Sequence, residues 1–284
     1  MAEQIALSPT RIRRWVRCKR SYYWRYGQKL VRIRKETPMS LGLVVGEALA
    51  GYYQDDKNAR SQELMNYQLE KVLGIHGALF LGNELDKGRQ GEWDKVRNNS
   101  RRILSSYHEW ASEKDDFYVV MVEATHQLQL APNISLLAIP DANVITPEEL
   151  PLVFEHKVRY RYRPGDFGID YQSVTSCIVS NAIGTLYNVL EYGKGKYHRE
   201  LIIRSDEELN YFRDMFVHIG EDILSTPWDR MYPMPFKRCS CEYWELCNAE
   251  MQGLDVDDVI SELYERTTRP KKEEPKEETS DNRN

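Results

Sequence analysis

Two apolar, β-prone runs joined by a proline-marked turn constrain the fold of this chain more than any other feature. The first run covers residues 134–145 and the second covers residues 152–158. Runs of this length and composition, with prolines between them, predict adjacent antiparallel strands. Asp141 is expected in the first strand and Glu155 in the second. The sequence therefore predicts two carboxylates on neighbouring strands.

The second run contains a Glu155-His156-Lys157 triplet. Because side chains alternate along a strand, Glu155 and Lys157 are expected to share one face, with His156 on the other. If strand pairing brings Asp141 alongside, two carboxylates can hold a hard divalent cation, and the lysine can stand beside a phosphate. An isolated Glu-x-Lys is more often an acid and a base that alternate on an exposed strand face. The neighbouring residues therefore have to decide between these interpretations.

Further polar residues accompany Asp141 and the Glu155-x-Lys157 pair in chain order. Glu123 lies in the preceding predicted strand, and Gln172 opens the helix that follows. This order, with Pro-Asp before Glu-x-Lys, resembles the PD-(D/E)XK nuclease superfamily. The resemblance is to its RecB-like branch, and to the CRISPR-associated Cas4-type exonucleases in particular.

The resemblance covers about residues 8–247 and implies Mg²⁺- or Mn²⁺-dependent hydrolysis of DNA phosphodiester bonds. It implies that Asp141, Glu155 and the backbone carbonyl of His156 bind the metal ion. Lys157 would position the attacking water or stabilise the developing charge. Further candidates near the metal or phosphate are Glu123, Gln172 and Glu47. The implied enzyme is an exonuclease acting on single-stranded or free-ended DNA. Its implied setting is recombination, repair or phage- or CRISPR-related processing, with a recombination or helicase protein as partner.

Two positions depart from the family pattern. The family places a metal-binding histidine four residues after a glycine, and counting from Gly42 gives Gly46. Glu47 is the nearest group that can substitute, although a solvated helix carboxylate explains it equally well. The tyrosine expected four residues after Gln172 is Ser176. These departures leave open the coordination number and the choice between Mg²⁺ and Mn²⁺. They also leave open the alternative of a catalytically inactive, nuclease-fold DNA-binding subunit.

The composition of the 284 residues is that of an ordinary globular chain, with 41% hydrophobic residues. No run of about 18 apolar residues predicts a membrane-spanning helix, so no membrane contact is expected. The N-terminus lacks the basic start and apolar core of a signal peptide. We therefore expect a protein of the cytoplasm, in a prokaryotic or phage-infected cell.

Positive charge is concentrated at the N-terminus. Residues 1–35 carry a net charge of +10, whereas the remainder carries −15. A helix expected over residues 8–26 interleaves arginines with aromatic residues, which suits phosphate contact and base stacking. The DNA-contacting candidates on it are Arg14, Arg17 and Arg20. An amphipathic helix with a buried aromatic face and solvated arginines is the alternative.

A second basic and aromatic run, residues 159–163, directly follows the Glu155-x-Lys157 pair. Arg159 and Arg161 are candidates for holding a DNA strand beside the site. Alternating Arg and Tyr also makes an exposed edge strand that resists aggregation. The sequence alone is compatible with both explanations.

Four of the five cysteines suggest a metal site. Cys239, Cys241 and Cys247 lie close together, and thiolates bind soft metals and iron-sulfur clusters. A four-iron cluster needs four cysteines, and the Cys18 segment resembles the N-terminal cysteine motif of the iron-sulfur RecB-like nucleases. The resemblance implies a 4Fe-4S cluster. Because Cys239-x-Cys241 has one intervening residue where the family has two, zinc and uncoordinated thiols stay open. A zinc-stapled interaction protein with a coincidental Glu-x-Lys is a further rival.

The expected architecture is an α/β, restriction-endonuclease-like fold. It has a mixed sheet of about four or five strands flanked by helices, a helical N-terminal part and a C-terminal cysteine clasp. Residues 1–265 are expected to form the nuclease domain, with a helical insert over about 55–112 and a disordered charged tail over 266–284. The other expected elements are helices over 40–54, 61–112 and 171–192, strands over 117–130 and 200–204, and a helix capped by Ser205.

Overall fold

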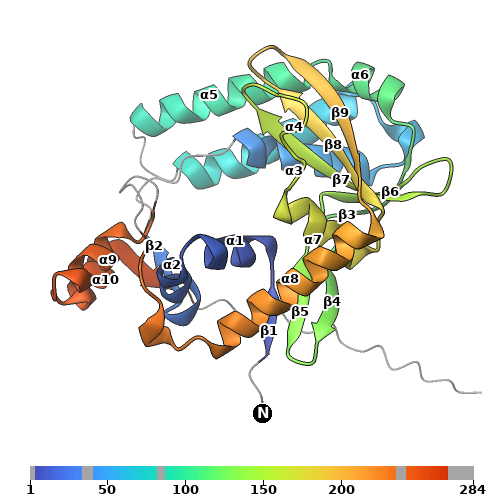
Figure 1. The fold of residues 1–284 in the computed structure, drawn as a ribbon. Coiled ribbons are helices and arrows are strands. Elements are labelled where there is room, and N and C mark those ends of the chain that lie inside the picture. The colour runs from blue at the N-terminus through green and yellow to red at the C-terminus, as the bar shows by residue number, and fades with distance from the viewer. Residues whose placement is uncertain (1–3, 34–40, 82–86, 235–240, 268–284) are drawn as a thin grey trace, which may run out of the picture. The chain divides into compact units, whose positions relative to one another are not determined.

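The computed structural model describes residues 4–33, 41–81, 87–234 and 241–267. The chain divides into two compact units, and Figure 1 shows their elements. The larger unit comprises residues 1–13 and 36–226, and the smaller unit comprises residues 14–35 and 227–284. Helix α1 (Pro9–Arg17) contains the first division between them. The cysteine-bearing segments at the two ends of the chain thus belong to the smaller unit.

A five-stranded mixed sheet forms the centre of the larger unit. Its strands, in spatial order, are β3 (Tyr118–Val122), β6 (Ala142–Ile145), β7 (Pro151–Arg159), β8 (Gly184–Glu191) and β9 (Lys196–Ile203). Strands β7 and β8 are parallel, and the other neighbours are antiparallel. The predicted antiparallel pairing around the proline-marked turn is confirmed, with Ala142 opposite Phe154. The α/β fold class and the mixed sheet are also confirmed.

A three-stranded sheet lies beside it in the same unit, in the order β1 (Ile5–Leu7), β5 (Ile134–Ala138), β4 (His126–Ala131). The chain passes from the larger sheet to the smaller one at Glu123 and returns at Asp141. The single strand predicted over residues 117–130 is therefore wrong. Glu123 interrupts it with a left-handed backbone (φ 48°), which a continuous strand cannot contain. Asp141 lies in a bend just before β6, not within a strand as expected.

Four helices build the core on one face of the five-stranded sheet. They are α3 (Leu41–Gln54), α4 (Gln62–Leu81), α5 (Lys87–Leu104) and α6 (Tyr107–Lys114). The predicted helices over 40–54 and 61–112 are confirmed within the described residues. Tyr53, Leu69, Ile103 and Phe154 are buried in one continuous apolar cluster between these helices and the sheet. The 3₁₀ turn η2 (Lys57–Ala59) follows α3.

Two further helices pack on the other elements of the larger unit. Helix α7 (Tyr171–Ser180) contacts β7 and the three-stranded sheet, and α8 (Asp206–Ser225) also packs on that smaller sheet. Ser205 caps α8 by accepting a hydrogen bond from the backbone N–H of Glu208, as predicted.

The helix predicted over residues 171–192 is only half correct. Helix α7 ends at Ser180, where Asn181 takes a left-handed conformation, and residues 184–191 form the central strand β8. Strand β8 is covered on both faces, so all of its residues except Leu186 are buried. Such a strand lacks the alternation that identifies a half-buried strand, and its periodicity cannot separate it from a buried helix.

The smaller unit is built from short elements drawn from both ends of the chain. They are α2 (Lys19–Tyr22), the π-helix η1 (Tyr23–Gly27), β2 (Leu30–Arg32), η3 (Trp228–Arg230), α9 (Trp244–Met251), α10 (Val256–Leu263) and β10 (Tyr264–Arg266). Strands β2 and β10 pair antiparallel. The continuous helix predicted over residues 8–26 is broken at Cys18, whose backbone is extended and whose sulfur caps α2. Most of the predicted tail, 268–284, lies outside the described residues.

Of the described helices, none combines the length and the apolar character needed to cross a bilayer.

Candidate active site

Glu155 and Lys157 project together from strand β7 of the larger unit. The Lys157 ammonium donates to Glu155 Oε2 at 3.0 Å, and the Glu155 side chain is fully buried. The His156 ring lies on the opposite face, stacked on Tyr53 with ring centroids 5.5 Å apart. The alternation expected from strand geometry is therefore present. This Glu-x-Lys pair is therefore not an ion pair on an exposed strand face, because neither side chain is exposed.

Asp141 joins the pair from the bend just before the neighbouring strand β6. Its Oδ2 accepts a hydrogen bond from the backbone N–H of His156 at 2.6 Å. Its position follows from the register, in which Ala142 at the start of β6 lies opposite Phe154 on β7. The two carboxylates, Asp141 and Glu155, thus flank one peptide of β7.

Helix α7 closes the site with its first turns. Gln172 donates to Glu155 Oε2 at 2.8 Å and accepts from the Lys157 ammonium at 3.1 Å. Asp170 caps the helix by accepting from the Gln172 backbone N–H. Ser176, one turn on, lies 3.5 Å from Glu155 Oε1. The structure thus brings Asp141, Glu155, Lys157 and Gln172 together.

The two carboxylates disfavour each other's charge. Burial, followed by the charge of Asp141, raises the pKa of Glu155 to about 7, although Lys157 partly opposes this shift. Burial also raises the pKa of Asp141, against the His156 backbone hydrogen bond and Lys157. Two acids with raised pKa values beside an amine are a common feature of functional sites, because a structural ion pair is arranged to avoid such repulsion.

Two more carboxylates lie near the site without joining its hydrogen bonds. Glu123 is exposed at the crossing between the sheets, and its backbone N–H donates to the Asp141 carbonyl at 3.1 Å. Burial, Asp141 and Glu47 raise the pKa of Glu123. Glu47 on α3 pairs with His76 on α4 at 2.7 Å. A Cβ at Gly46, the position of the absent histidine, would meet no neighbouring atom within 4 Å.

The oxygen atoms of the two carboxylates are ligands of the kind that a hard divalent cation prefers. Asp141 and Glu155 supply carboxylate oxygens, and a cation between them would favour their charged forms, which burial disfavours by raising both pKa values. Within the described ranges, no three His, Cys, Asp or Glu side chains are grouped to hold a metal ion by themselves. A cation here would therefore take its remaining ligands from backbone oxygens, water or a substrate phosphate, as Mg²⁺ commonly does.

The predicted thiol site lies in the smaller unit. Cys18, Cys241 and Cys247 line one cavity of about 310 Å³, whereas Cys239 lies outside the described residues. Trp24 donates to the Cys247 sulfur at 3.4 Å, and burial raises the pKa of Cys247 to about 11. The three sulfurs face a shared, mostly apolar space, and thiolate ligands in such a setting suit iron or zinc. Cys177 is a buried residue of α7, as expected for a small core side chain.

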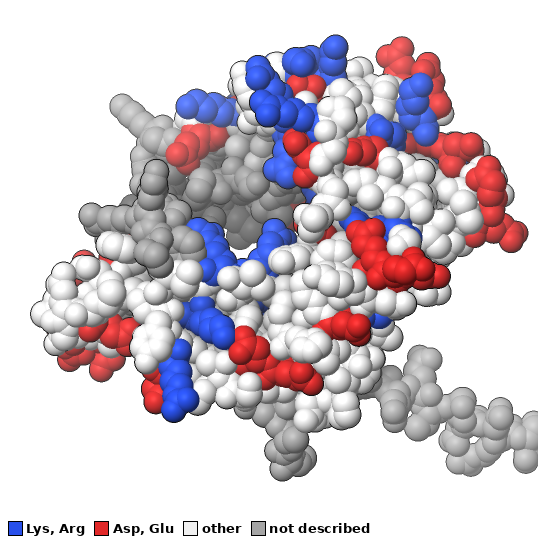
Figure 2. All heavy atoms as spheres, viewed as in Figure 1, with Lys and Arg blue, Asp and Glu red and all other residues white. Residues whose placement is uncertain are grey.

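The candidate DNA-contacting arginines differ in their availability. Arg20 is 8% exposed, pairs with Glu250 and packs over Tyr23 and Trp24. Arg14 pairs with Glu242 at 2.6 Å. The exposed candidates are Arg17, Arg159 and Arg161. In Figure 2 Lys and Arg side chains of the visible face lie beside Asp and Glu side chains.

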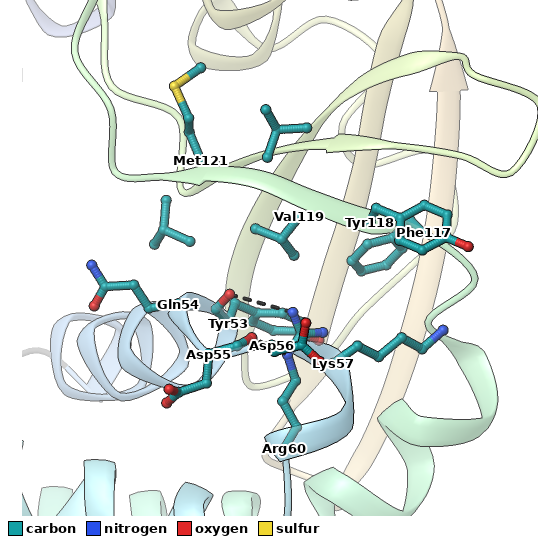
Figure 3. Close-up of a pocket in the computed structure, with 12 residues that line it drawn as sticks. Tyr53, Gln54, Asp55, Asp56, Lys57, Arg60, Phe117, Tyr118, Val119 and Met121 are labelled. Atoms are coloured by element: carbon teal, nitrogen blue, oxygen red, sulfur yellow. Dashed lines mark hydrogen bonds between the residues drawn. The ribbon is translucent and has the colours of Figure 1, made fainter.

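A separate cavity of about 450 Å³ lies along the edge strand β3. Figure 3 shows the lining residues Tyr53 of α3 and Lys57 of η2 across from that strand, with Asp55 and Arg60 in the adjoining turns. Neither Asp141, Glu155, Lys157 nor Gln172 lines it. The candidate catalytic residues therefore belong to the junction of the two sheets and not to this cavity.

Comparison with known proteins identifies the family. A family model described as the PD-(D/E)XK nuclease superfamily matches residues 6–248. The chain therefore belongs to the PD-(D/E)XK nuclease superfamily. This membership implies a nuclease that acts on DNA and uses divalent metal ions. The predicted superfamily is confirmed, whereas the Cas4-type branch and the iron-sulfur motif stay predictions.

Two other comparisons add little. No curated protein matches the chain. The solved structure titled "Crystal structure of SSO0001" is similar over 88% of this chain and 88% of that chain, with 11% identity and a TM-score of 0.40.

Sequence reasoning missed the polar residues that lie behind the site, on the face of the sheet that carries the His156 ring. Asn188 and Arg199 lie on strands β8 and β9, and Asp115 follows α6. None of them carries a local motif, and Asn188 lies in a segment predicted as helix. Only the strand register, with Asn188 opposite both His156 and Arg199, would have revealed them.

Proposed function

We propose that this chain is a Mg²⁺- or Mn²⁺-dependent deoxyribonuclease that acts as an exonuclease at the junction of its two sheets. One observation carries the proposal: the Lys157 ammonium is held between Glu155 Oε2 and Gln172 Oε1, at 3.0 and 3.1 Å. Asp141 is fixed to the intervening peptide. An amine oriented beside two carboxylates is what phosphodiester hydrolysis requires in this superfamily.

Each side chain has a distinct part in the proposed reaction. Asp141 and Glu155, with the His156 carbonyl, would hold the cation, with Glu123 and Glu47 as further candidates. A divalent cation supplies Lewis-acid activation and charge neutralisation when bound. Lys157 orients the attacking water or stabilises the negative charge that develops on the phosphate. Gln172 holds the Lys157 amine and the Glu155 carboxylate in a fixed relative position, because it hydrogen-bonds to both.

The test is degradation of end-labelled single- and double-stranded DNA with Mg²⁺, Mn²⁺ or EDTA. Lys157→Ala is compared with the wild type, and Lys71→Ala on α4 is the control because Lys71 is exposed. We expect metal-dependent cleavage from the ends, its loss in Lys157→Ala and no change in Lys71→Ala. Cleavage that persists in Lys157→Ala, with the same metal dependence, would contradict the proposed site.

A DNA-binding subunit without catalysis is the second candidate. Gly46 and Ser176, at positions where the family has a histidine and a tyrosine, favour it. Ser176 nevertheless contacts Glu155, so this position still contributes to the site. Wild type and Lys157→Ala that bind DNA equally and cleave none would support this second function.

We further propose that Cys18, Cys239, Cys241 and Cys247 hold a 4Fe-4S cluster, with zinc as the alternative. Support comes from the cavity that the three described cysteines share. Iron, sulfide and zinc analysis of anaerobically purified protein separates the two. Absence of all three elements would leave the cysteines as uncoordinated thiols.

The proposed substrate is DNA that is single-stranded or has free ends. The proposed phosphate contacts are the exposed arginines Arg17, Arg159 and Arg161, with Arg14 and Arg20 contributing less because their side chains are only 21% and 10% exposed. A role in recombination, repair or phage- or CRISPR-related processing, beside a recombination or helicase protein, completes the proposal.

A further inference from the structure

His156 connects the two faces of the five-stranded sheet. Its backbone N–H donates to Asp141 on the side of the candidate metal site. Its ring points the other way, under helix α3, where it stacks on Tyr53. Any force that fixes the ring on one face therefore fixes the peptide on the other. The contacts of the ring thus bear on the geometry of the metal site.

A row of polar residues crosses three strands and ends on that ring. His156 on β7, Asn188 on β8 and Arg199 on β9 are direct cross-strand partners. The Asn188 amide nitrogen lies 2.9 Å from His156 Nδ1, and the Asn188 oxygen accepts from the Arg199 guanidinium. Because the amide nitrogen can only donate, Nδ1 of His156 is the acceptor, and the ring proton lies on Nε2. The row thereby selects one tautomer and one orientation of the ring.

The far end of the row is anchored by a buried ion pair. Arg199 pairs with Asp115, whose side chain is only 3% exposed. Tyr53 donates to Asp115 at 2.7 Å, and Tyr107 accepts from Asn188 at 2.8 Å. The larger unit supplies these partners itself, whereas His156 Nε2 and Arg199 Nε are buried without a hydrogen-bond partner among the described residues.

Such a polar network is energetically unfavourable in a core, compared with apolar side chains of similar size. A buried ion pair seldom stabilises a fold more than well-packed apolar residues would, because both charges lose their hydration. Leu69 and Ile103 show that apolar side chains fill the same cluster elsewhere. A polar row retained there suits a different purpose, which is to specify one geometry.

We propose that the row of Asp115, Arg199 and Asn188 positions the metal site. It acts through the His156 ring, which fixes the backbone between Glu155 and Lys157. Asn188 and Arg199 are positioning residues that touch neither metal nor DNA. The inference rests on the proposed function, since it assigns these residues to the same site. Residues that orient metal ligands from behind commonly change metal affinity by tenfold to a hundredfold when they are replaced.

The test is direct measurement of Mn²⁺ binding to the full chain, without DNA, by titration calorimetry and by Mn²⁺ electron paramagnetic resonance. In Asn188→Leu the link to the ring is lost while the volume is kept, and we expect Mn²⁺ to bind at least about tenfold more weakly. Ile223→Ala on α8 is the control, because it removes a buried contact far from the row in sequence and sheet. It should lower the melting temperature and leave the Mn²⁺ affinity unchanged.

A conservative variant separates positioning from simple stability. Asn188→Asp can still accept from Arg199, and it can accept from His156 once the ring proton moves to Nδ1. We expect Mn²⁺ affinity near that of the wild type, with the tautomer change visible in ¹⁵N chemical shifts of the ring. If Asn188→Leu does not fold, as judged by circular dichroism, the smaller Asn188→Ser takes its place with the same expectation.

The outcomes distinguish this inference from the function on which it rests. Asp141→Asn measured in parallel reports on the metal site itself. Weakened binding in Asp141→Asn beside unchanged binding in a folded Asn188→Leu would overturn the positioning role alone. A wild type that binds no Mn²⁺ would overturn the proposed function and this inference with it.

Discussion

The carboxylate site of the larger unit and the cysteine cavity of the smaller unit are held together in different ways. Glu155, Lys157 and Gln172 bond to one another, and Asp141 bonds to the next peptide. The cysteines have far fewer protein partners: Cys247 accepts from Trp24, and Cys18 accepts from the Ser21 backbone. The first site is therefore formed by the protein's own hydrogen bonds, whereas the second would be completed by the cluster or zinc ion proposed above.

The electrostatics of the two regions differ in the same sense. Lys157 already offsets part of the charge of Glu155 and Asp141. In the cavity, burial raises the pKa values of Cys241 and Cys247, so these thiols are protonated at neutral pH without a metal. Metal binding must displace those protons, and the binding energy then contributes to folding. The difference predicts that loss of a metal disables the first site and unfolds the second.

The largest expected effect is on the smaller unit. Cys247→Ser should release the bound iron or zinc and destabilise this unit by several kcal/mol, because a structural metal site contributes on the order of 10 kcal/mol to folding. Elemental analysis and limited proteolysis report the two effects. Cys177→Ala is the matched control, since Cys177 is buried in the larger unit. An unchanged metal content in Cys247→Ser would show that Cys247 does not bind the metal.

The second effect falls on activity alone. Asp141→Asn should lower the rate of DNA cleavage by about a hundredfold to a thousandfold, the usual cost of removing one key charge from an active site. Its melting temperature should stay close to that of the wild type, because asparagine can still accept the His156 hydrogen bond. A large fall in melting temperature would mean that the carboxylate site, too, depends on its charges for folding.

The same contrast explains what could be predicted from the sequence. The spacing of Glu155 and Lys157 on a strand fixes their shared face, because alternation is a local property of extended backbone. Asp141 could be placed beside them from one strand pairing. The row behind them could not, since Asn188 and Arg199 meet His156 only through the order β7-β8-β9, which no local pattern encodes.

The errors in the predicted elements have a similar origin. Glu123 divides a strand because the chain changes sheets there, and β1 is recognisable only through its parallel pairing with β5. Strand β8 is buried along nearly its whole length, so an alternation of buried and exposed residues is missing. Each error lies where tertiary pairing overrides local pattern.

A third prediction concerns how much the carboxylate site lowers the folding stability of the metal-free protein. A raised folded-state pKa of about 7 for Glu155 means that the native state binds the proton more tightly than the unfolded chain does. Stability is therefore lost as the pH rises from about 4.5 towards 7. Glu155→Gln has no such loss, and should be more stable than the wild type at pH 8 by on the order of 1 to 3 kcal/mol.

Urea unfolding in EDTA at pH 5 and pH 8 measures this difference. At pH 5 Glu155 is mostly protonated in the native state, so the two proteins should have nearly equal free energies of unfolding. Added Mn²⁺ should stabilise only the wild type. A Glu155→Gln protein that is less stable than the wild type at pH 8 would show that the Lys157 ion pair outweighs burial.

The smallest expected effect is at the exposed arginines that follow β7. Arg161→Ala should weaken DNA binding by only a few-fold, because a single phosphate contact in water contributes little. It should also lower the slope of log affinity against log salt concentration by about 1, since one fewer counterion is released. Arg213→Ala on α8 is the control, and should change neither quantity. Fluorescence anisotropy with single-stranded DNA at several salt concentrations measures both. If the salt slope of Arg161→Ala equals that of the wild type, the bound DNA strand does not pass along residues 159–163.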